Sequence, residues 1–135
     1  MATIKNEYLG ELRTRATHLQ SGNTLITDAP IDNQGRGEAF SPTDLLATAL
    51  GSCMLTIMGI VARDKGIDIE GVELETTKIM AADPRRVARL DVSFTFPKKQ
   101  PYTDKEKMIL EKAARTCPVY YSLDPALEKN LEFNW

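Results

Sequence analysis

Two cysteines carry the most specific chemistry of this chain, and they lie far apart in the sequence, at positions 53 and 117. Cys53 lies in ALGSCMLTIMGI, inside a run (45–62) without any Asp, Glu, Lys or Arg, and Cys117 lies in RTCPVYYS. A thiolate is a nucleophile that is oxidised reversibly to a sulfenic acid, which then condenses with a second thiol. The pair therefore predicts redox chemistry, provided that the fold brings the two Cα atoms within roughly 7 Å of each other.

The bulk composition narrows the class of protein further. The 135 residues are enough for one domain (1–135), and the charged and apolar fractions of 27% and 42% are those of an ordinary globular protein. A formal charge of −2 provides no basic surface for nucleic acid or for anionic lipid. Because His18 is the only histidine and neither cysteine belongs to a CxxC motif, we expect no metal and no cofactor.

The first ten residues, MATIKNEYLG, are relevant to the cellular compartment in which the protein is expected. They lack the basic segment followed by an apolar stretch that a secretory signal needs. We therefore expect a cytoplasmic protein, in which thiols are kept reduced and a cysteine pair is more often catalytic than structural.

The run that contains the first cysteine is expected to form a helix over about 42–65. Ser41 fits the N-cap, Pro42 the first helical position, and Asp44 the third, where its carboxylate can accept from free backbone amides. Gly66 favours the end of the helix.

This expected helix is apolar on nearly every face. Its uncharged run is long enough for a membrane span, but Gly, Ser and Thr dilute the hydrophobicity and no aromatic or basic anchors flank it, so we expect no membrane partner. A helix that is apolar all round must otherwise be surrounded by protein. A chain of this length can hardly wrap it alone, so we expect burial against a second subunit, with small residues at positions 47–49, 51 and 52 allowing close helix contact.

The other elements follow from period-two and period-3.6 patterns and from turn residues. A capping box (Thr103 with Glu106) opens a helix to about 116, with Met108, Ile109, Ala113 and Ala114 as its buried stripe. The remaining expected elements are strands at 8–18 and 24–27, a loop at 28–40, strands at 72–80 and 89–96 joined by a hairpin at 83–86, a short helix after Pro118, and a strand at 131–135. The order ββαββααβ predicts an α+β fold with antiparallel sheets around a long buried helix.

The two cysteines are expected in different environments. A buried cysteine in a helix is often only a small hydrophobe, although polar residues of the 28–40 loop could reach the face of Cys53. Cys117 immediately precedes Pro118, the expected first residue of a helix, where the helix dipole and free N–H groups favour the thiolate. Arg115 adds positive charge nearby. The residues alone therefore predict a lower pKa for Cys117 than for Cys53.

The segments FSPTDLLATALGSC and CPVYYSL resemble two motifs of the OsmC/Ohr superfamily, which comprises osmotically inducible protein C and the organic hydroperoxide resistance proteins. The first is similar to the family's P-x-E-L-L-x-A-x-x-x-x-C helix and the second to its C-P-V helix start, and the strand pattern fits along essentially the whole chain. The resemblance implies an OsmC-like fold and an intertwined homodimer, with active sites at the interface.

The resemblance also implies a reaction. Cys53 would be the peroxidatic residue that reduces an organic hydroperoxide and becomes a sulfenic acid, and Cys117 would be the resolving residue that forms a disulfide with it. A dithiol such as dihydrolipoamide, or another small thiol, would reduce that disulfide. The family order of attack disagrees with the pKa order predicted above, and we follow the family for the order of attack.

A thiolate in an apolar pocket needs a nearby cation, because burial otherwise favours the protonated thiol. In the family an arginine held by an acidic residue has this role, and the candidates here are Arg13, Arg15 and Arg36, of which we favour Arg13 and Arg36. The hydroperoxide-resistance branch has Glu directly after the motif proline, where this chain has Thr43. Asp44 lies one residue later, about 100° further round the helix, so it cannot simply replace that Glu.

Two alternatives to the peroxidase stay open at this point. One is a binding module in which the apolar pocket holds a small hydrophobic or electrophilic ligand and the cysteines do not cycle. The other is a general thiol–disulfide or persulfide handler, whose pocket would not distinguish peroxides by their tails.

Overall fold

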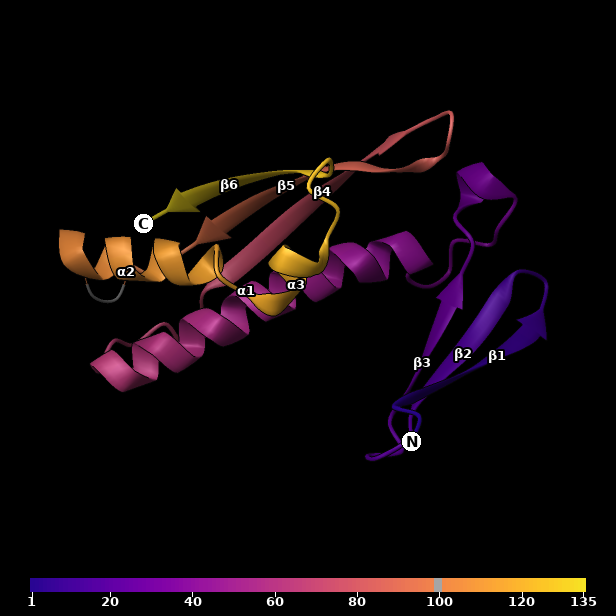
Figure 1. Ribbon diagram of the computed structural model, residues 1–135, viewed down its shortest axis with the longest axis horizontal. Helices are drawn as coiled ribbons and strands as arrows, with labels where there is room; N and C mark the ends of the chain where they lie inside the picture. The colour runs from indigo at the N-terminus through magenta and orange to yellow at the C-terminus, as the bar shows by residue number, and fades with distance from the viewer. Residues whose placement is uncertain (99–100) are drawn as a thin grey trace. The chain divides into compact units, whose positions relative to one another are not determined.

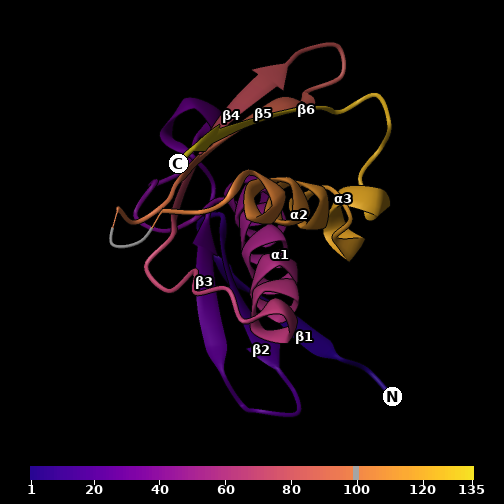
Figure 2. The ribbon, with the colours of Figure 1, turned by 90° about the vertical axis from the view of Figure 1, so that its left-hand side faces the viewer.

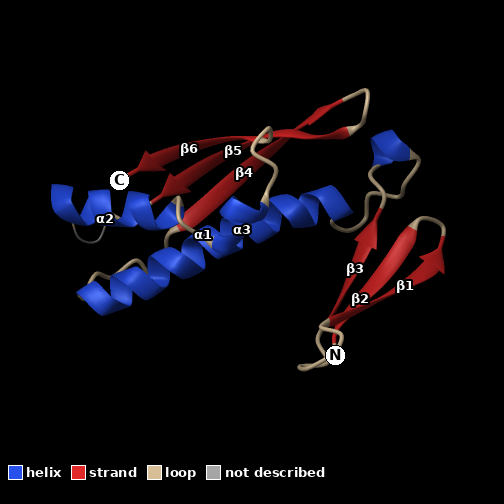
Figure 3. Cartoon of the chain, viewed as in Figure 1, coloured by secondary structure: helices blue, strands red, loops and turns tan. Residues whose placement is uncertain are grey.

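The computed structural model describes residues 1–98 and 101–135, which form two compact units, Met1–Leu46 and Ala47–Trp135. Figures 1 and 3 show the elements of each unit. The α+β class with two sheets and three α-helices, predicted from the sequence, is confirmed.

The first unit contains a three-stranded antiparallel sheet in the order β1-β2-β3, formed by β1 (Ile4–Gly10), β2 (Arg13–His18) and β3 (Thr24–Asp28). The prediction of one strand over 8–18 was wrong, because the chain reverses at a two-residue turn between β1 and β2. Glu11 and Leu12 both have positive φ there, 52° and 63°. The pair Glu-Leu lacks the Asn-Gly signature that usually marks such a turn. The sequence therefore shows no break between the two strands.

Helix α1 (Pro42–Lys65) begins and ends where the sequence predicts. The Ser41 Oγ accepts from the backbone N–H of Asp44 at 3.1 Å, and the Asp44 carboxylate accepts from the N–H of Ser41 at 2.9 Å. This reciprocal cap satisfies two of the amides that open the helix. Gly66 follows the helix with a φ of +69°, a conformation that glycine adopts without steric cost.

The second unit contains a sheet in the order β4-β5-β6, with α1 and two further helices on one of its faces (Figure 2). Its elements are β4 (Glu73–Ala81), β5 (Arg86–Thr95), α2 (Asp104–Ala114), α3 (Pro118–Ser122) and β6 (Glu128–Asn134). The expectation of purely antiparallel sheets was wrong, since β6 runs parallel to β5. The two helices between these strands form the crossover that a parallel pair requires.

The core of the second unit lies between this sheet and α1. The side chains of Leu50, Met54 and Met58 project from α1 at helical spacing and are fully buried. They pack in one cluster with Phe94 of β5 and Leu110 of α2.

The predicted buried stripe of α2 was partly wrong. Ala113 and Ala114 are buried, whereas Met108 is 69% exposed and Leu110 takes the central buried position. Leu110 lies three and four residues before the two buried alanines, so all three share one helix face.

Among the described residues, α1 is the one helix long and apolar enough to cross a membrane by length and composition. Core helices of globular proteins pass the same test. The buried residues of α1 contact protein side chains of the second unit, which is the arrangement of a core helix.

Candidate functional site

The structure brings the two cysteines together within the second unit. Cys53 lies in the middle of α1 and Cys117 lies at the N-cap of α3, and the two thiols are close enough for Cys53 to influence the pKa of Cys117. Both are free thiols. Two residues that are 64 positions apart in the sequence thus form one pair, as disulfide chemistry requires.

Two elements position Cys117. Pro118 occupies the first turn of α3, and the backbone N–H of Tyr120 donates to the Cys117 sulfur at 3.3 Å. The side chain is completely buried. The helix start therefore forms as predicted and presents its free amides to this sulfur.

The prediction of a lowered pKa for Cys117 was nevertheless wrong. Burial is the largest influence and raises the pKa of this thiol, because an apolar environment disfavours the thiolate. The backbone N–H groups of Tyr120 and Val119 lower it by less, and the Cys53 thiol raises it further. Cys117 is therefore held as the neutral thiol near neutral pH.

Cys53 has a more open environment. It is half-buried and packs against the apolar core cluster of the second unit, so it has apolar neighbours on that side and some solvent access on the other. Ile57 lies one helical turn further along α1 and is partly buried against the same cluster. This combination suits a thiol that must meet a small substrate.

In the first unit, Arg13 lies at the start of β2 and directly opposite Asp28 of β3 in the strand register. The Arg13 Nε donates to Asp28 Oδ1 at 2.7 Å, and the Nη2 donates to Asp28 Oδ2 at 2.9 Å and to Glu38 Oε2 at 3.0 Å. The Arg13 guanidinium lowers the pKa of Asp28 despite the opposing effect of burial. Arg13 is thus a fixed cation held by two carboxylates.

The other two candidate arginines form exposed pairs. Arg15 donates to Glu7 on the neighbouring strand at 3.1 Å, and Arg36 pairs with Glu11 at the β1–β2 turn. All four of these side chains are substantially exposed. Such surface pairs hold a side chain only loosely, so Arg13 is the best ordered of the three candidates. That one of them serves Cys53 stays a prediction.

Sequence reasoning did not find Asp28 as the partner of Arg13. No signal for it was present in the sequence, because only the folded strand shows that the Asp28 side chain is 1% exposed. An ionised residue that is so deeply buried requires a partner. Thr43 and Asp44 both take part in the cap of α1, Thr43 through a contact with Ser41 at 3.2 Å.

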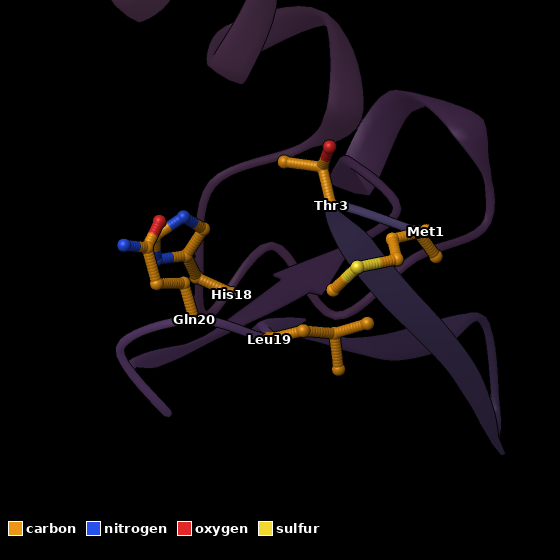
Figure 4. A pocket seen from close by; sticks show the side chains of 6 residues that line it. Met1, Thr3, His18, Leu19 and Gln20 are labelled. Atoms are coloured by element: carbon orange, nitrogen blue, oxygen red, sulfur yellow. The ribbon is translucent and has the colours of Figure 1, made fainter.

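A separate hollow of about 620 Å³ lies in the first unit near the N-terminus (Figure 4). Its lining includes Met1, Thr3, His18 and Leu19. The His18 ring bonds the hydroxyl of Ser21 at 2.6 Å, in keeping with a turn residue. None of the predicted site residues lines it. Across residues 1–98 and 101–135, no three His, Cys, Asp or Glu side chains are grouped as they would be around a metal ion.

The fold and the thiol pair define an α+β protein with two cysteines in contact, one on a long core helix and one at a short helix start. Residues 35–132 match the family model described as OsmC-like protein, and this chain belongs to that family. No curated protein matched the sequence.

Solved structures of the same fold support this assignment. One from Psychrobacter arcticus 273-4, described as an osmotic stress induced and detoxification response protein, is 56% identical with a TM-score of 0.94, over 99% of this chain and 96% of that one. An organic hydroperoxide resistance protein OsmC from Legionella pneumophila is 19% identical, with a TM-score of 0.74 over 98% and 95%. One from Vibrio cholerae, with captopril bound in one of its active sites, is 13% identical, with a TM-score of 0.76 over 99% and 92%. At the lower identities the likeness concerns the fold alone.

The buried position and raised pKa of Cys117 predict selective labelling. At pH 7 we expect iodoacetamide to alkylate Cys53 at least about tenfold faster than Cys117, because only the thiolate reacts and only Cys53 has solvent access. Mass spectrometry of peptides over time measures both rates, and denatured protein provides the control in which they converge. Equal rates in the folded protein would contradict the assignment.

The lowered pKa of Asp28 predicts how stability depends on pH. Its ion pair with Arg13 stabilises the folded state fully above the ordinary carboxyl pKa of about 3.9, and this contribution is lost as the pH falls through the lowered folded-state value. The difference in unfolding free energy between wild type and Asp28→Asn should therefore be largest above pH 5 and shrink towards pH 2. Urea unfolding measures it. Glu7→Gln, which breaks the exposed pair with Arg15, is the control and should show a small difference throughout.

Proposed function

We propose that this protein is a thiol-dependent peroxidase that reduces organic hydroperoxides with Cys53 and Cys117. The observation that carries the proposal is the contact between the two thiols, one partly accessible and one buried. A resolving cysteine adjacent to the attacking one forms a disulfide before the sulfenic acid can be oxidised further. The proposed setting is the cytoplasm, where small dithiols are available.

The proposed cycle has three steps. The Cys53 thiolate attacks the distal peroxide oxygen, the O–O bond breaks, and the alkoxide takes a proton and leaves as an alcohol, so that Cys53 becomes a sulfenic acid. The Cys117 sulfur then attacks the Cys53 sulfur, the S–S bond forms, and the hydroxyl group leaves as water. A dithiol of the dihydrolipoamide type reduces the disulfide by exchange and becomes a disulfide itself.

The raised pKa of Cys117 agrees with the proposed division of roles. A neutral thiol is a poor nucleophile, so Cys117 does not compete for the peroxide. It can transfer its proton to the leaving hydroxyl group in the resolving step. Burial thus favours Cys53 as the residue that reacts first.

Arg13 is the proposed cation for the Cys53 thiolate, and Arg36 is the second candidate. The two carboxylates beside Arg13 raise its already high pKa, so it stays charged at any working pH. Its side chain is 28% exposed, which leaves it partly desolvated and therefore effective as a charge. Arg36 is 44% exposed and paired at the surface, which supports it less well.

The apolar surround of Cys53 supports a substrate with a hydrocarbon tail. Ile57 and Val61 lie four and eight residues after Cys53, on the same face of the helix, and are partly buried against the core. Such a surface stabilises a bound alkyl group by roughly 25 cal/mol per Å² that is removed from water. Hydrogen peroxide has no such group, so it is the poorer proposed substrate. The relative from Legionella pneumophila, which is called an organic hydroperoxide resistance protein, agrees with a peroxide substrate.

A binding module is the second candidate function. The observation that favours it is the same raised pKa of Cys117, because a buried, neutral thiol beside a second cysteine is also the arrangement of a purely structural pair. In that case the apolar surface would hold a hydrophobic or electrophilic ligand without turnover. The two functions differ in whether both cysteines change oxidation state.

Intact mass under non-reducing conditions separates these functions. After one equivalent of cumene hydroperoxide, we expect the reduced wild type to lose two hydrogens and Cys117→Ser to gain one oxygen, because its sulfenic acid cannot be resolved. Cys53→Ser should stay unchanged. A gain of oxygen by Cys53→Ser would reverse the two roles, and no mass change in the wild type would refute the peroxidase.

We also propose that the working form is a homodimer. One face of the β1-β2-β3 sheet carries Ile4, Tyr8 and Leu25, which are 53%, 65% and 44% exposed. A three-stranded sheet needs an apolar face packed against something, and none of the apolar residues on this face is fully buried. The exposed side of α1 is also small or apolar, at Ala49, Ser52, Thr56 and Ile60. A second copy of the chain would cover both surfaces.

The dimer predicts a selective effect of charge on α1. Ile60→Arg should convert the dimer to a monomer, because an unpaired charge in a packed interface costs several kcal/mol. Sedimentation equilibrium measures the mass. Met108→Arg, on an exposed position of α2, is the matched control and should leave the mass unchanged. A monomeric wild type at micromolar concentration would refute the proposal.

A further inference from the structure

We propose that Lys129 is a positioning residue for the leaving group when the Cys53–Cys117 disulfide is reduced. Through the ring of Tyr120, it holds the Tyr120 backbone N–H on the Cys117 sulfur, which carries the negative charge as the S–S bond breaks. This inference rests on the proposed function and concerns the step in which the reductant regenerates the thiols. All four residues lie in the second unit, Ala47–Trp135.

Lys129 faces the core side of the second sheet. It lies on β6 two residues before Leu131, and alternate residues of a strand share one face. Leu131 and Phe133 on this face pack against the core cluster, and Lys129 itself is half-buried. Within residues 1–98 and 101–135, no carboxylate forms an ion pair with it. A charged group that is partly removed from water in this way needs other polar partners.

The ammonium group of Lys129 has two such partners. Its Nζ donates to the carbonyl of Leu127 at 2.9 Å and lies over the Tyr120 ring, 5.0 Å from the ring centroid. A cation over the face of an aromatic ring is attracted by the ring quadrupole, and more strongly where water is partly excluded. Lys129 therefore connects the start of β6 to α3.

Tyr120 transmits this contact to the sulfur of Cys117. Its backbone N–H donates to the Cys117 Sγ at 3.3 Å, and this hydrogen bond lowers the pKa of the thiol, although burial outweighs it. Helix α3 has only five residues, so its own backbone hydrogen bonds stabilise it weakly. A side-chain contact that holds Tyr120 in place therefore also holds the donor on the sulfur.

Burial determines which sulfur of the disulfide the reductant attacks. Cys117 is completely buried, whereas Cys53 has some solvent access, so a thiolate of the dithiol attacks the Cys53 sulfur. The S–S bond between the two cysteines breaks, its electron pair stays on the Cys117 sulfur, and that sulfur then takes a proton. The second thiol of the reductant attacks the mixed disulfide on Cys53. The dithiol leaves as a cyclic disulfide, and both cysteines are thiols again.

The departing sulfur influences the rate of the first of these attacks. A thiol leaves faster when its pKa is lower, and burial raises the pKa of Cys117. The Tyr120 N–H acts on the atom where the charge develops, in surroundings that exclude water, which is where a fixed donor is most effective. Loss of Lys129 should weaken this hydrogen bond and slow reduction more than it slows the attack of Cys53 on a peroxide.

The test compares the rates of reduction and oxidation. Dithiothreitol reduces the purified disulfide form, and the thiols released over time are counted by mass after alkylation with N-ethylmaleimide. Lys129→Met should slow reduction by about threefold to fivefold, because the leaving thiolate loses part of its hydrogen bond. The ratio of this rate to the rate of oxidation by cumene hydroperoxide should fall by the same factor. Lys129→Arg keeps a cation for the ring and should be reduced within about twofold of the wild-type rate.

Lys107 provides a matched control. Its Nζ lies 5.8 Å from the centroid of the Trp135 ring, so Lys107→Met removes the same charge and the same kind of contact elsewhere in the second unit. This variant should be reduced as fast as the wild type. Equal slowing by Lys107→Met and Lys129→Met would overturn the proposal, and so would reduction of Lys129→Met at the wild-type rate.

A double-mutant cycle shows whether Lys129 acts through the ring. Tyr120→Leu removes the ring but keeps the backbone N–H, so it should slow reduction about as much as Lys129→Met. The double variant should then be no slower than either single variant. Multiplied effects would show that the two side chains act separately, which refutes the role of Tyr120. If Lys129→Met does not unfold cooperatively in urea, Tyr120→Leu alone is decisive, and an unchanged rate of reduction overturns the proposal.

A second oxidant separates this inference from the proposed function. Diamide joins two thiols in a disulfide without a peroxide and is itself reduced to a hydrazine. If the wild type does not reduce cumene hydroperoxide but Lys129→Met slows reduction of the disulfide formed by diamide, the peroxidase is refuted and the role of Lys129 stands. If the wild type reduces the hydroperoxide and Lys129→Met is reduced at the wild-type rate, the peroxidase stands and the role of Lys129 is refuted.

Discussion

The burial of α1 in the second unit is the constraint on which the rest of the structure depends. Leu50, Met54 and Met58 are completely buried against the sheet, so the rotation of the helix about its axis is determined by its core residues. That rotation sets the direction in which Cys53 points, and it brings this thiol to the start of α3. An apolar helix is thus both the scaffold of the site and the source of its low polarity.

The low polarity around Cys117 determines the direction in which the pKa of its thiol is shifted. At Cys117 the helix start and complete burial act in opposite directions on the pKa, and burial wins. The helix-terminus effect is typically worth less than 1 kcal/mol, whereas desolvation of a buried charge costs several. The same apolar surround that would hold a hydrocarbon tail therefore disfavours a thiolate. The proposed peroxidase reaction therefore needs a fixed cation, for which Arg13 is the proposed residue.

The sequence predicted the local elements that depend on only a few adjacent residues. The cap at Ser41 and Asp44, the capping box at Thr103 and the start of α3 at Pro118 all formed as expected. These motifs act within one turn of helix, so no distant contact can override them easily. The contact between the two cysteines followed from the resemblance to the family and not from spacing.

What could not be predicted depends on contacts between distant residues. The β1–β2 turn has no glycine or asparagine at its two central positions, and the parallel pairing of β6 depends on the path of α2 and α3. The sign of the Cys117 pKa shift required the burial of its side chain, which only the packed core determines.

The carboxylate that pairs with Arg13 could not be predicted from the sequence for the same reason. The family motif has its acidic residue directly after the proline, where this chain has Thr43 followed by Asp44. Strand pairing instead places Asp28 opposite Arg13, at a separation of 15 residues. An ion pair requires only that the charges meet in space, so a partner on another strand cannot be identified from a helix motif. The partner of Arg13 is therefore determined by the register of β2 and β3, and not by the residues that follow the motif proline.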